Sequence, residues 1–263
     1  MNRITQLFKD KKDAKKKSLI IFLTAGDPNL ETTAKLIPAI AEAGADLIEI
    51  GVPFSDPIAD GPTIQKAGQR ALAGGTTVKK ILKMVADVRK VSQVPLLLFG
   101  AYNPFLKYGL EKIVKDALKA GVDGFLIPDL PMEESEEFQS IVNKNDMHLI
   151  YLIAPTSDNK RIKEIAKKST SFLYYMALCG VTGVRNTLPP DLGTNLKRIQ
   201  SQTNLPIVVG FGISKPEHVK QIAPLADGVV VGSAVVKIIE EKGNSKDIVS
   251  EVKSYVSSLA KKL

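Results

Sequence analysis

The stretch DLIEIGVPFSDPIADGPT, residues 46–63, places one acidic residue inside an apolar strand and two more in the loop that follows. Glu49 lies between Ile48 and Ile50, and side chains alternate along a strand, so Glu49 faces away from both isoleucines. A carboxyl group that loses water has a raised pKa unless a cation lies beside it. Such a group can exchange protons near neutral pH, which makes Glu49 a candidate general acid–base. A structural glutamate, bonded to backbone groups or to a lysine, is the alternative.

The loop after Glu49 contains two aspartates and several prolines. Its prolines limit the conformations of the chain, and Asp-Gly-Pro at 60–62 favours a tight turn. Asp56 is interpreted as a turn-forming residue. For Asp60, which follows Glu49 by eleven residues, the spacing alone is equally compatible with a turn-forming role and with a role facing a substrate.

Three glycine-rich stretches follow apolar runs in the second half of the chain. They are CGVTG (179–183), GFGIS (210–214) and VGSAVV (231–236). Glycine lets backbone N–H groups come close to phosphate oxygens, and Ser233 adds a hydroxyl where a helix is expected to begin. Each stretch alone is compatible with an ordinary turn, but the three together predict a phosphate-binding site.

The chain has two histidines and one cysteine. His148 opens an apolar run, at the end opposite to that expected for an active site, and His218 follows Pro216 in a helical segment. Both are interpreted as structural residues. Cys179 has no nearby histidine to activate it and is interpreted as incidental. Since His, Cys and carboxylate residues do not have the spacing of a ligand set, we expect no metal site.

Eight apolar runs of strand length alternate with segments of helical periodicity. Helical segments such as LEKIVKDALKAG carry apolar residues at i, i+3, i+4 and i+7. Continuously apolar strands in strict alternation with helices predict a parallel sheet covered on both faces. Eight such units favour a single-domain (β/α)8 TIM barrel over residues 1–263, with an open doubly wound sheet as the alternative. The runs are SLIIFLT (18–24), DLIEIG (46–51), PLLLFGA (95–101), DGFLIP (123–128), HLIYLIAP (148–155), SFLYYMA (171–177), PIVVGFG (206–212) and DGVVVGS (227–233).

Two further helices complete the expected barrel. ITQLFKDK, near the N-terminus, is expected to cap the bottom of the barrel, and SAVVKII is expected to form a short helix after the eighth strand. In this fold the active site forms at the C-terminal ends of the strands, and Glu49 lies near such an end. Leu47 and Glu49 then point into the barrel. An unpaired inward carboxylate costs stability, which favours the functional interpretation of Glu49 over the structural one.

Composition narrows the class of protein. The formal net charge is +8, but the lysines are dispersed, Trp is absent and aromatic residues make up 6% of the chain, which argues against a nucleic-acid partner. No apolar run approaches the roughly 20 residues that span a bilayer. The N-terminal segment lacks the apolar middle of a signal peptide, and a single cysteine suits a reducing compartment. We therefore expect a cytoplasmic protein with no membrane contact.

Several of these motifs together resemble the tryptophan synthase α subunit family. The resemblance covers about residues 3 to 260 and implies the barrel fold. It implies a lyase that cleaves indole-3-glycerol phosphate to indole and glyceraldehyde 3-phosphate without a cofactor of its own. It further implies that indole passes to a pyridoxal-phosphate β subunit in an α2β2 assembly. The motifs are LIEIGVPFSDPIADGPTIQ (47–65), FLTAGDP (22–28), YNPFLKYG (102–109), PDLPMEES (128–135), GVTG (180–183), GFGIS and VGSAVVKII.

The resemblance also implies roles for individual residues. Glu49 and Asp60 match the two catalytic carboxylates of the family, and Thr182 matches a threonine that meets the catalytic loop on closure. Positions that match the phosphate site are Gly183, Gly212, Gly232 and Ser233. Positions that match apolar neighbours of the indole ring, each with barrel core as its alternative role, are Phe22, Leu126, Leu152, Tyr174 and Phe211.

One segment departs from the family pattern. Ala177-Leu178-Cys179 stands where a serine, often with a further polar residue, usually precedes Gly-Val-Thr-Gly. This predicts less effective closure of the loop 177–191 and weaker control by a β subunit. Segments 53–57, 102–108 and 128–134 would meet that partner. The alternatives are a sugar-phosphate epimerase or isomerase, a subunit that chiefly binds and activates a partner, and a lyase that releases indole without one.

Overall fold

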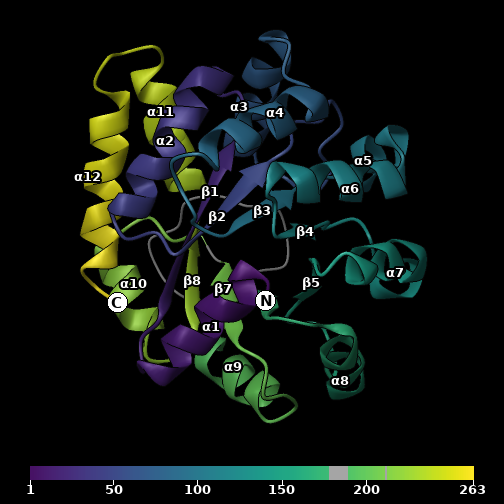
Figure 1. The fold of residues 1–263 in the computed structure, drawn as a ribbon. Coiled ribbons are helices and arrows are strands. Elements are labelled where there is room, and N and C mark those ends of the chain that lie inside the picture. Colours follow the sequence, from purple (N-terminus) through teal and green to yellow (C-terminus); the bar gives the residue numbers. More distant parts are fainter. Residues whose placement is uncertain (178–188, 211) are drawn as a thin grey trace.

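Eight parallel strands form the centre of this computed structural model, which describes residues 1–177, 189–210 and 212–263. Neighbouring strands pair in chain order and β8 pairs with β1, so the sheet closes into a barrel. The expected (β/α)8 barrel is confirmed, and the open sheet is excluded (Figure 1). The strands are β1 (Ser18–Thr24), β2 (Leu47–Gly51), β3 (Leu96–Phe99), β4 (Gly124–Leu126), β5 (His148–Ile153), β6 (Leu173–Met176), β7 (Ile207–Gly210) and β8 (Gly228–Val231).

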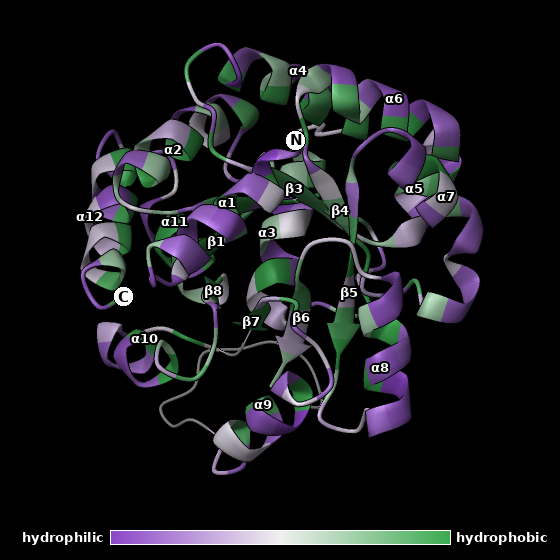
Figure 2. Ribbon diagram, turned by 60° about the horizontal axis from the view of Figure 1, so that its bottom comes forward, coloured by the Kyte–Doolittle hydropathy of each residue, from purple (hydrophilic) through white to green (hydrophobic). Residues whose placement is uncertain are grey.

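Helices surround the strands and turn their apolar sides toward them (Figure 2). Glycines end two helices as the sequence predicts, because Gly44 and Gly121 have φ of 107° and 94°, a region that suits glycine. The helices around the barrel are α2 (Leu30–Glu42), α3 (Pro62–Ala73), α4 (Val78–Val88), α5 (Tyr102–Tyr108), α6 (Leu110–Ala120), the 3-10 helix η1 (Met132–Glu134), α7 (Glu136–Lys144), α8 (Asn159–Lys168), α9 (Leu192–Gln200), α10 (Pro216–Ile222), α11 (Ser233–Lys242) and α12 (Ile248–Ala260).

The strands separate two apolar clusters. Leu47 belongs to the cluster inside the barrel, whereas Ile48 and Ile50 pack between the strands and the helices. Side chains alternate along a strand, so Glu49 shares the inward face with Leu47. The predicted direction of this part of β2 is therefore confirmed.

The N-terminal helix α1 (Arg3–Asp13) closes the end of the barrel where the strands begin. Ile4 and Phe8 join the interior cluster, and the Phe8 ring lies 4.9 Å from that of Phe172. His148, at the start of β5, contacts the hydroxyls of Thr5 and Thr170 through its two ring nitrogens, at 2.8 and 2.7 Å. His148 thus ties α1 to the barrel, in agreement with the structural role expected for it.

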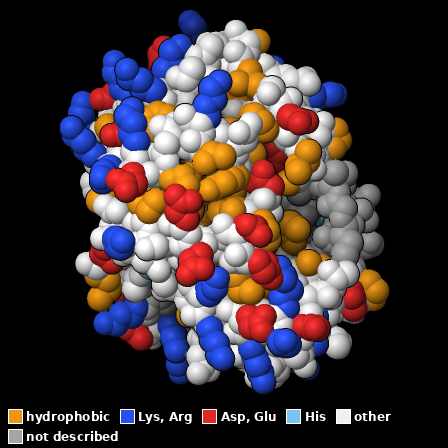
Figure 3. Space-filling model, turned by 90° about the vertical axis from the view of Figure 1, so that its right-hand side faces the viewer, with side chains coloured by type: hydrophobic (Ala, Val, Ile, Leu, Met, Phe, Trp, Pro, Cys, Tyr) orange, Lys and Arg blue, Asp and Glu red, His pale blue; other side chains and the backbone are white. Residues whose placement is uncertain are grey.

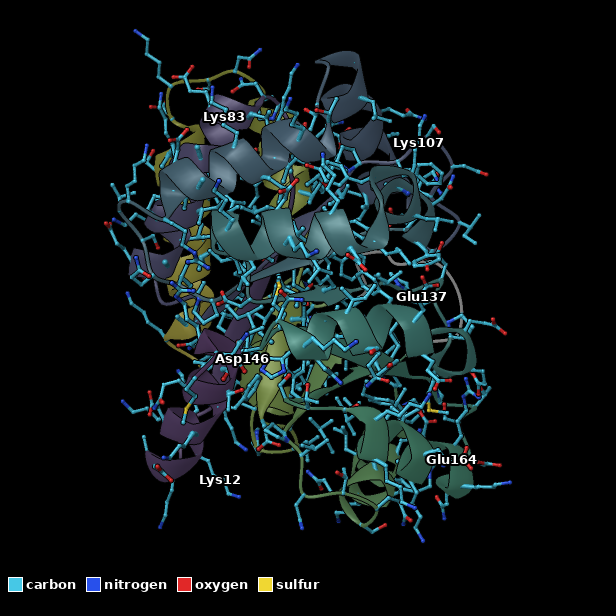
Figure 4. The ribbon with its side chains drawn as sticks, turned by 45° about the vertical axis from the view of Figure 1, so that its right-hand side comes forward. Lys12, Lys83, Lys107, Glu137, Asp146 and Glu164 are labelled. Carbon is cyan, nitrogen blue, oxygen red and sulfur yellow. The ribbon has the colours of Figure 1, made fainter. Side chains whose placement is uncertain are left out.

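Charged side chains are spread over the outer helices. Those labelled in Figure 4 project from the fold into solvent, and each is exposed. The labelled residues are Lys12, Lys83, Lys107, Glu137, Asp146 and Glu164.

Most observed strands are shorter than the apolar runs that predicted them. The run 95–101 contains the four-residue β3, and the run 123–128 contains the three-residue β4. The remaining apolar residues continue into the loops at the mouth of the barrel. Helix α5 was not predicted, although Pro104 lies in its first turn, where proline is tolerated because no N–H is needed there.

Candidate active site

Glu49 lies inside the barrel on β2, beside Phe22 of β1 and Leu97 of β3 in the strand register. It is 1% exposed, and burial raises the pKa of its carboxyl group to about 8. Within the described part of the chain, Glu49 Oε1 has no hydrogen-bond partner and no cation pairs with the carboxyl group. The structural alternative, a glutamate bonded to backbone groups or to a lysine, therefore finds no support among these residues.

Asp60 lies in the loop between β2 and α3, at the edge of a pocket in the mouth of the barrel. Both backbone groups of Asp60 form hydrogen bonds. Its N–H donates to Pro57 O at 3.2 Å, and its carbonyl accepts from Gln65 Nε2 at 2.9 Å. Burial, and then the negative charge of Asp129, raise the pKa of Asp60 to about 6. Asp129 lines the same pocket.

Two aromatic rings form an apolar wall of this pocket. The rings of Phe22 and Phe99 meet edge to face, with centroids 5.3 Å apart. Gly51 leaves room for the Phe22 ring, since a Cβ at this position would lie 2.4 Å from Phe22 Cζ. A flat apolar ligand with a polar edge directed at Asp60 fits these surroundings.

The other predicted ring neighbours lie deeper or farther around the barrel. Tyr174 is 8% exposed inside the barrel, and burial together with the nearby Glu49 raises its pKa. Leu126 is fully buried in the interior cluster, which is the core role left open for it. Leu152 packs partly against that cluster and lines a second hollow beside the segment 127–132.

The predicted phosphate positions that the structure describes lie after β7 and β8. Gly232 precedes α11, and Ser233 is the first residue of that helix, as expected. The first N–H groups of an α-helix have no partner within it, and such groups commonly bind phosphate. Gly212 and Gly232 are both partly exposed. Thr182, Gly183 and Phe211 lie outside the described residues, as does Cys179.

Ion pairs brace the elements around this end of the barrel. Arg70 of α3 donates to both carboxylate oxygens of Asp27, which follows β1, at 2.8 and 2.9 Å. The same guanidinium reaches Glu240 on α11 at 2.9 Å. Because Asp27 is 2% exposed, removing its partner would leave a buried charge uncompensated. Arg70 therefore fixes α11, with its N-terminal turn, relative to β1 and α3.

The pocket-lining residues to which sequence reasoning gave no role in the active site include Thr24, Gly51, Phe99 and Asp129. Thr24, Gly51 and Phe99 each lie two residues after an inward-facing strand position, so strand alternation alone was sufficient to place them on the inward face. Asp129 belongs to a motif that carried the resemblance and to a segment expected to meet the partner, but it was given no role in the active site. Its Oδ1 accepts a hydrogen bond from Tyr102 N at 2.9 Å, at the start of α5.

The described residues contain neither a metal-binding cluster nor a membrane-spanning helix. No group of three or more His, Cys, Asp or Glu side chains in this part of the chain is arranged to hold a metal ion. None of its helices has the length and apolar character required to cross a membrane. His218 is buried on α10 and does not join a cluster of this kind.

The pKa of Glu49 predicts a pH-dependent stability difference for Glu49→Gln. The unfolded carboxyl has a pKa near 4.5, whereas in the fold it is about 8, so the native state keeps a proton that the unfolded chain loses. The stability of the parent protein should therefore fall as pH rises through this window, while that of the variant should not. The quantity to compare is the free energy of unfolding, measured with urea. Between about pH 5 and about pH 9, we expect the difference between variant and parent to shift in favour of the variant by roughly 2–4 kcal/mol.

Glu164→Gln, which alters an exposed glutamate on α8, is the matched control for this measurement. Its stability relative to the parent should not change over the same pH range. A constant difference between the Glu49→Gln and parent proteins would contradict a raised pKa at Glu49.

The sequence is similar to tryptophan synthase alpha chains over nearly its whole length. The family model described as tryptophan synthase alpha chain matches residues 8–263. A tryptophan synthase alpha chain of Geobacter sulfurreducens is 49% identical over 259 residues, which are 98% of each chain. One from Caldanaerobacter subterraneus is 47% identical with the same coverage.

Solved structures of tryptophan synthase chains also have the same fold as this chain. The tryptophan synthase alpha chain of Legionella pneumophila superposes with a TM-score of 0.92 at 37% identity, covering 100% of this chain and 97% of that one. A chain of the tryptophan synthase complex from Pyrococcus furiosus gives 0.85 at 38% identity, covering 92% and 97%. With its closed barrel, its buried carboxyl and this similarity throughout, the chain belongs to the tryptophan synthase alpha chain family.

Proposed function

We propose that Glu49 and Asp60 carry out the α reaction of tryptophan synthase, the retro-aldol cleavage of indole-3-glycerol phosphate to indole and glyceraldehyde 3-phosphate. The observation that carries the assignment is the state of Glu49, a buried carboxyl group without a partner among the described residues and with a pKa of about 8. A group with this pKa is protonated before the reaction and can release its proton near neutral pH.

Glu49 exchanges two protons with the substrate. The protonated carboxyl first donates to C3 of the indole ring, which leaves positive charge on the ring nitrogen. The resulting carboxylate then takes the proton of the hydroxyl on the adjacent chain carbon. The bond between C3 and that carbon breaks as the C–O bond becomes the aldehyde carbonyl, and its electron pair restores the aromatic ring. Glu49 ends protonated, ready for another cycle.

Asp60 stabilises the charged ring. Ionised, it accepts a hydrogen bond from the indole N–H, and this bond strengthens as positive charge develops on the nitrogen. Its pKa of about 6 keeps it largely ionised at neutral pH, whereas Glu49 remains largely protonated. Two carboxyl groups in different surroundings thus take different roles.

The rest of the substrate lies across the mouth of the barrel. Phe22 with Phe99 packs against the indole ring, and backbone N–H groups at Gly212, Gly232 and Ser233 hold the phosphate. The resemblance extends the phosphate site to Gly183 and the ring pocket to Leu126, Leu152, Tyr174 and Phe211. It also assigns Thr182 to loop closure.

We further infer that the chain works with a β subunit in an α2β2 assembly in the cytoplasm and needs no cofactor of its own. Pyridoxal phosphate belongs to the β subunit, which receives the indole. One similar structure is that of a tryptophan synthase complex, which supports a partner of this kind. Figure 3 shows hydrophobic side chains gathered in the middle of one face, a distribution typical of an interaction surface.

Leu106→Asp is expected to weaken binding of the β subunit. Leu106 lies on α5, in a segment proposed to meet the partner, and is 51% exposed. Placing a charge in an apolar contact should lower the affinity by roughly 10- to 100-fold, measured by calorimetric titration. Leu118→Asp is the matched control, because this exposed leucine lies on α6 outside the proposed segments. Equal losses from both variants would argue against the α5 contact.

The assignment is tested by supplying indole-3-glycerol phosphate and measuring indole, with the chain alone and with added β subunit. Release of indole that increases on addition of the β subunit is the expected result. Undetectable indole in both states would favour a subunit that only binds and activates its partner. Equal release in both states would favour a lyase that works independently.

A further inference from the structure

Thr24 presents an unused hydroxyl group to the proposed active site. It is the last residue of β1, two positions after Phe22 and therefore on the same inward face. The residue is 3% exposed and lines the pocket that contains Asp60. Among the described residues, no group forms a hydrogen bond with Thr24 Oγ1.

A hydroxyl in this state is costly. Leaving a buried polar group without a partner costs about 1–3 kcal/mol, and most such groups find a protein, water or ligand partner. Ser18, Ser171 and Ser214 also have unpartnered hydroxyls among the described residues, but none of them lines the pocket. Of the described side chains that do line it, only Thr24, Asp60 and Asp129 carry polar atoms. Thr24 is thus the neutral hydroxyl in a pocket otherwise lined by carboxylates and apolar groups.

The position of β1 indicates which part of the substrate this hydroxyl faces. β1 pairs on one side with β8, where Ile21 lies beside Val231, and on the other side with β2, where Thr24 lies beside Gly51. The proposed phosphate site follows β8, and the Asp60 loop follows β2. A ligand that extends from one to the other crosses the end of β1. In indole-3-glycerol phosphate, the part between phosphate and ring is a three-carbon chain with two hydroxyls.

We propose that Thr24 Oγ1 forms a hydrogen bond with a hydroxyl of this three-carbon chain and so selects substrates that carry it. A hydroxyl can donate and accept, which matches a hydroxyl of the substrate. Through this bond, the Thr24 hydroxyl gains a hydrogen-bond partner only when substrate is bound. A site with a buried polar group rejects an analogue that leaves this group unpaired. The inference rests on the proposed function, because it takes the substrate from it.

The test compares two ligands in two proteins. Indole-3-glycerol phosphate carries both chain hydroxyls, whereas 3-(indol-3-yl)propyl phosphate keeps the ring and the phosphate and lacks them. Binding is measured by calorimetry with Glu49→Gln, which prevents turnover, and with Glu49→Gln/Thr24→Val. Valine keeps the branched shape of threonine without the hydroxyl. We expect the affinity for indole-3-glycerol phosphate to fall about 10-fold and that for the analogue to remain unchanged.

Thr24→Ser, which keeps the hydroxyl, should retain most of the affinity for the glycerol compound. The valine variant should unfold at the same temperature as the parent or higher, because it removes an unpaired buried hydroxyl. Equal losses for both ligands would reduce Thr24 to a packing role and overturn the inference, as would no loss for either. If the protein with Thr24 intact bound neither ligand, the proposed function itself would fail.

Discussion

Glu49→Gln is expected to lower the rate of indole release from indole-3-glycerol phosphate by roughly 10³-fold or more, because one carboxyl group performs both proton transfers. Glutamine has nearly the same shape and can still donate hydrogen bonds, but it cannot give a proton to C3 or take one from the chain hydroxyl. The side chain is 1% exposed, so water has little access to replace it.

The measurement is a single-turnover assay of indole with and without the β subunit. Binding of 3-(indol-3-yl)propyl phosphate is the control, since this ligand needs the pocket but no proton transfer, and its affinity should change little. Residual activity above about a tenth of the parent rate would remove Glu49 from the proposed mechanism.

The pH dependence of the parent enzyme follows from the same residue. Glu49 must carry a proton when substrate binds, so the rate should fall on the alkaline side as pH passes about 8. Asp60 must be ionised, so the rate should fall on the acid side below about 6. A bell-shaped profile between these values belongs to the pair of groups acting together.

The sequence predicted the barrel and the direction of Glu49 because both depend on local patterns. Eight apolar runs separated by helical periodicity leave few ways to bury the strands, and alternation along β2 follows from strand geometry. The positions at which the strands end were predicted less accurately. The run 95–101 remains apolar after β3 ends at Phe99, since these loop residues also pack at the mouth of the barrel.

The electrostatic surroundings required the structure. The sequence did not indicate that Asp129, 69 residues after Asp60, lines the same pocket and raises its pKa. It also gave no measure of whether a cation accompanies Glu49 inside the barrel. Both properties depend on contacts between loops far apart in the chain. Thr24, in contrast, lies two residues after Phe22 on the same strand, so alternation of side chains was sufficient to predict its inward direction.

Asp60→Asn is expected to reduce the rate of indole release by roughly 10²- to 10³-fold, an effect typical of removing one electrostatic contact to a transition state. Asparagine keeps the size of the side chain and can still accept a hydrogen bond from the indole N–H. It lacks the negative charge that stabilises the positively charged ring. The loss should therefore appear mainly in the rate of the chemical step and only weakly in substrate affinity.

Asp56→Asn provides the matched control for Asp60→Asn, because Asp56 lies four residues earlier in the same loop and is exposed. Its variant should retain the parent rate in the isolated chain. The Asp60 variant should also lose the acid limb near pH 6, since the group that titrates there is gone. An Asp60→Asn protein with a reduced rate but an unchanged acid limb would assign that limb to another group. Because asparagine keeps the size of the side chain, an Asp60→Asn protein that retained the parent rate would instead show that the charge of Asp60 takes no part in the reaction.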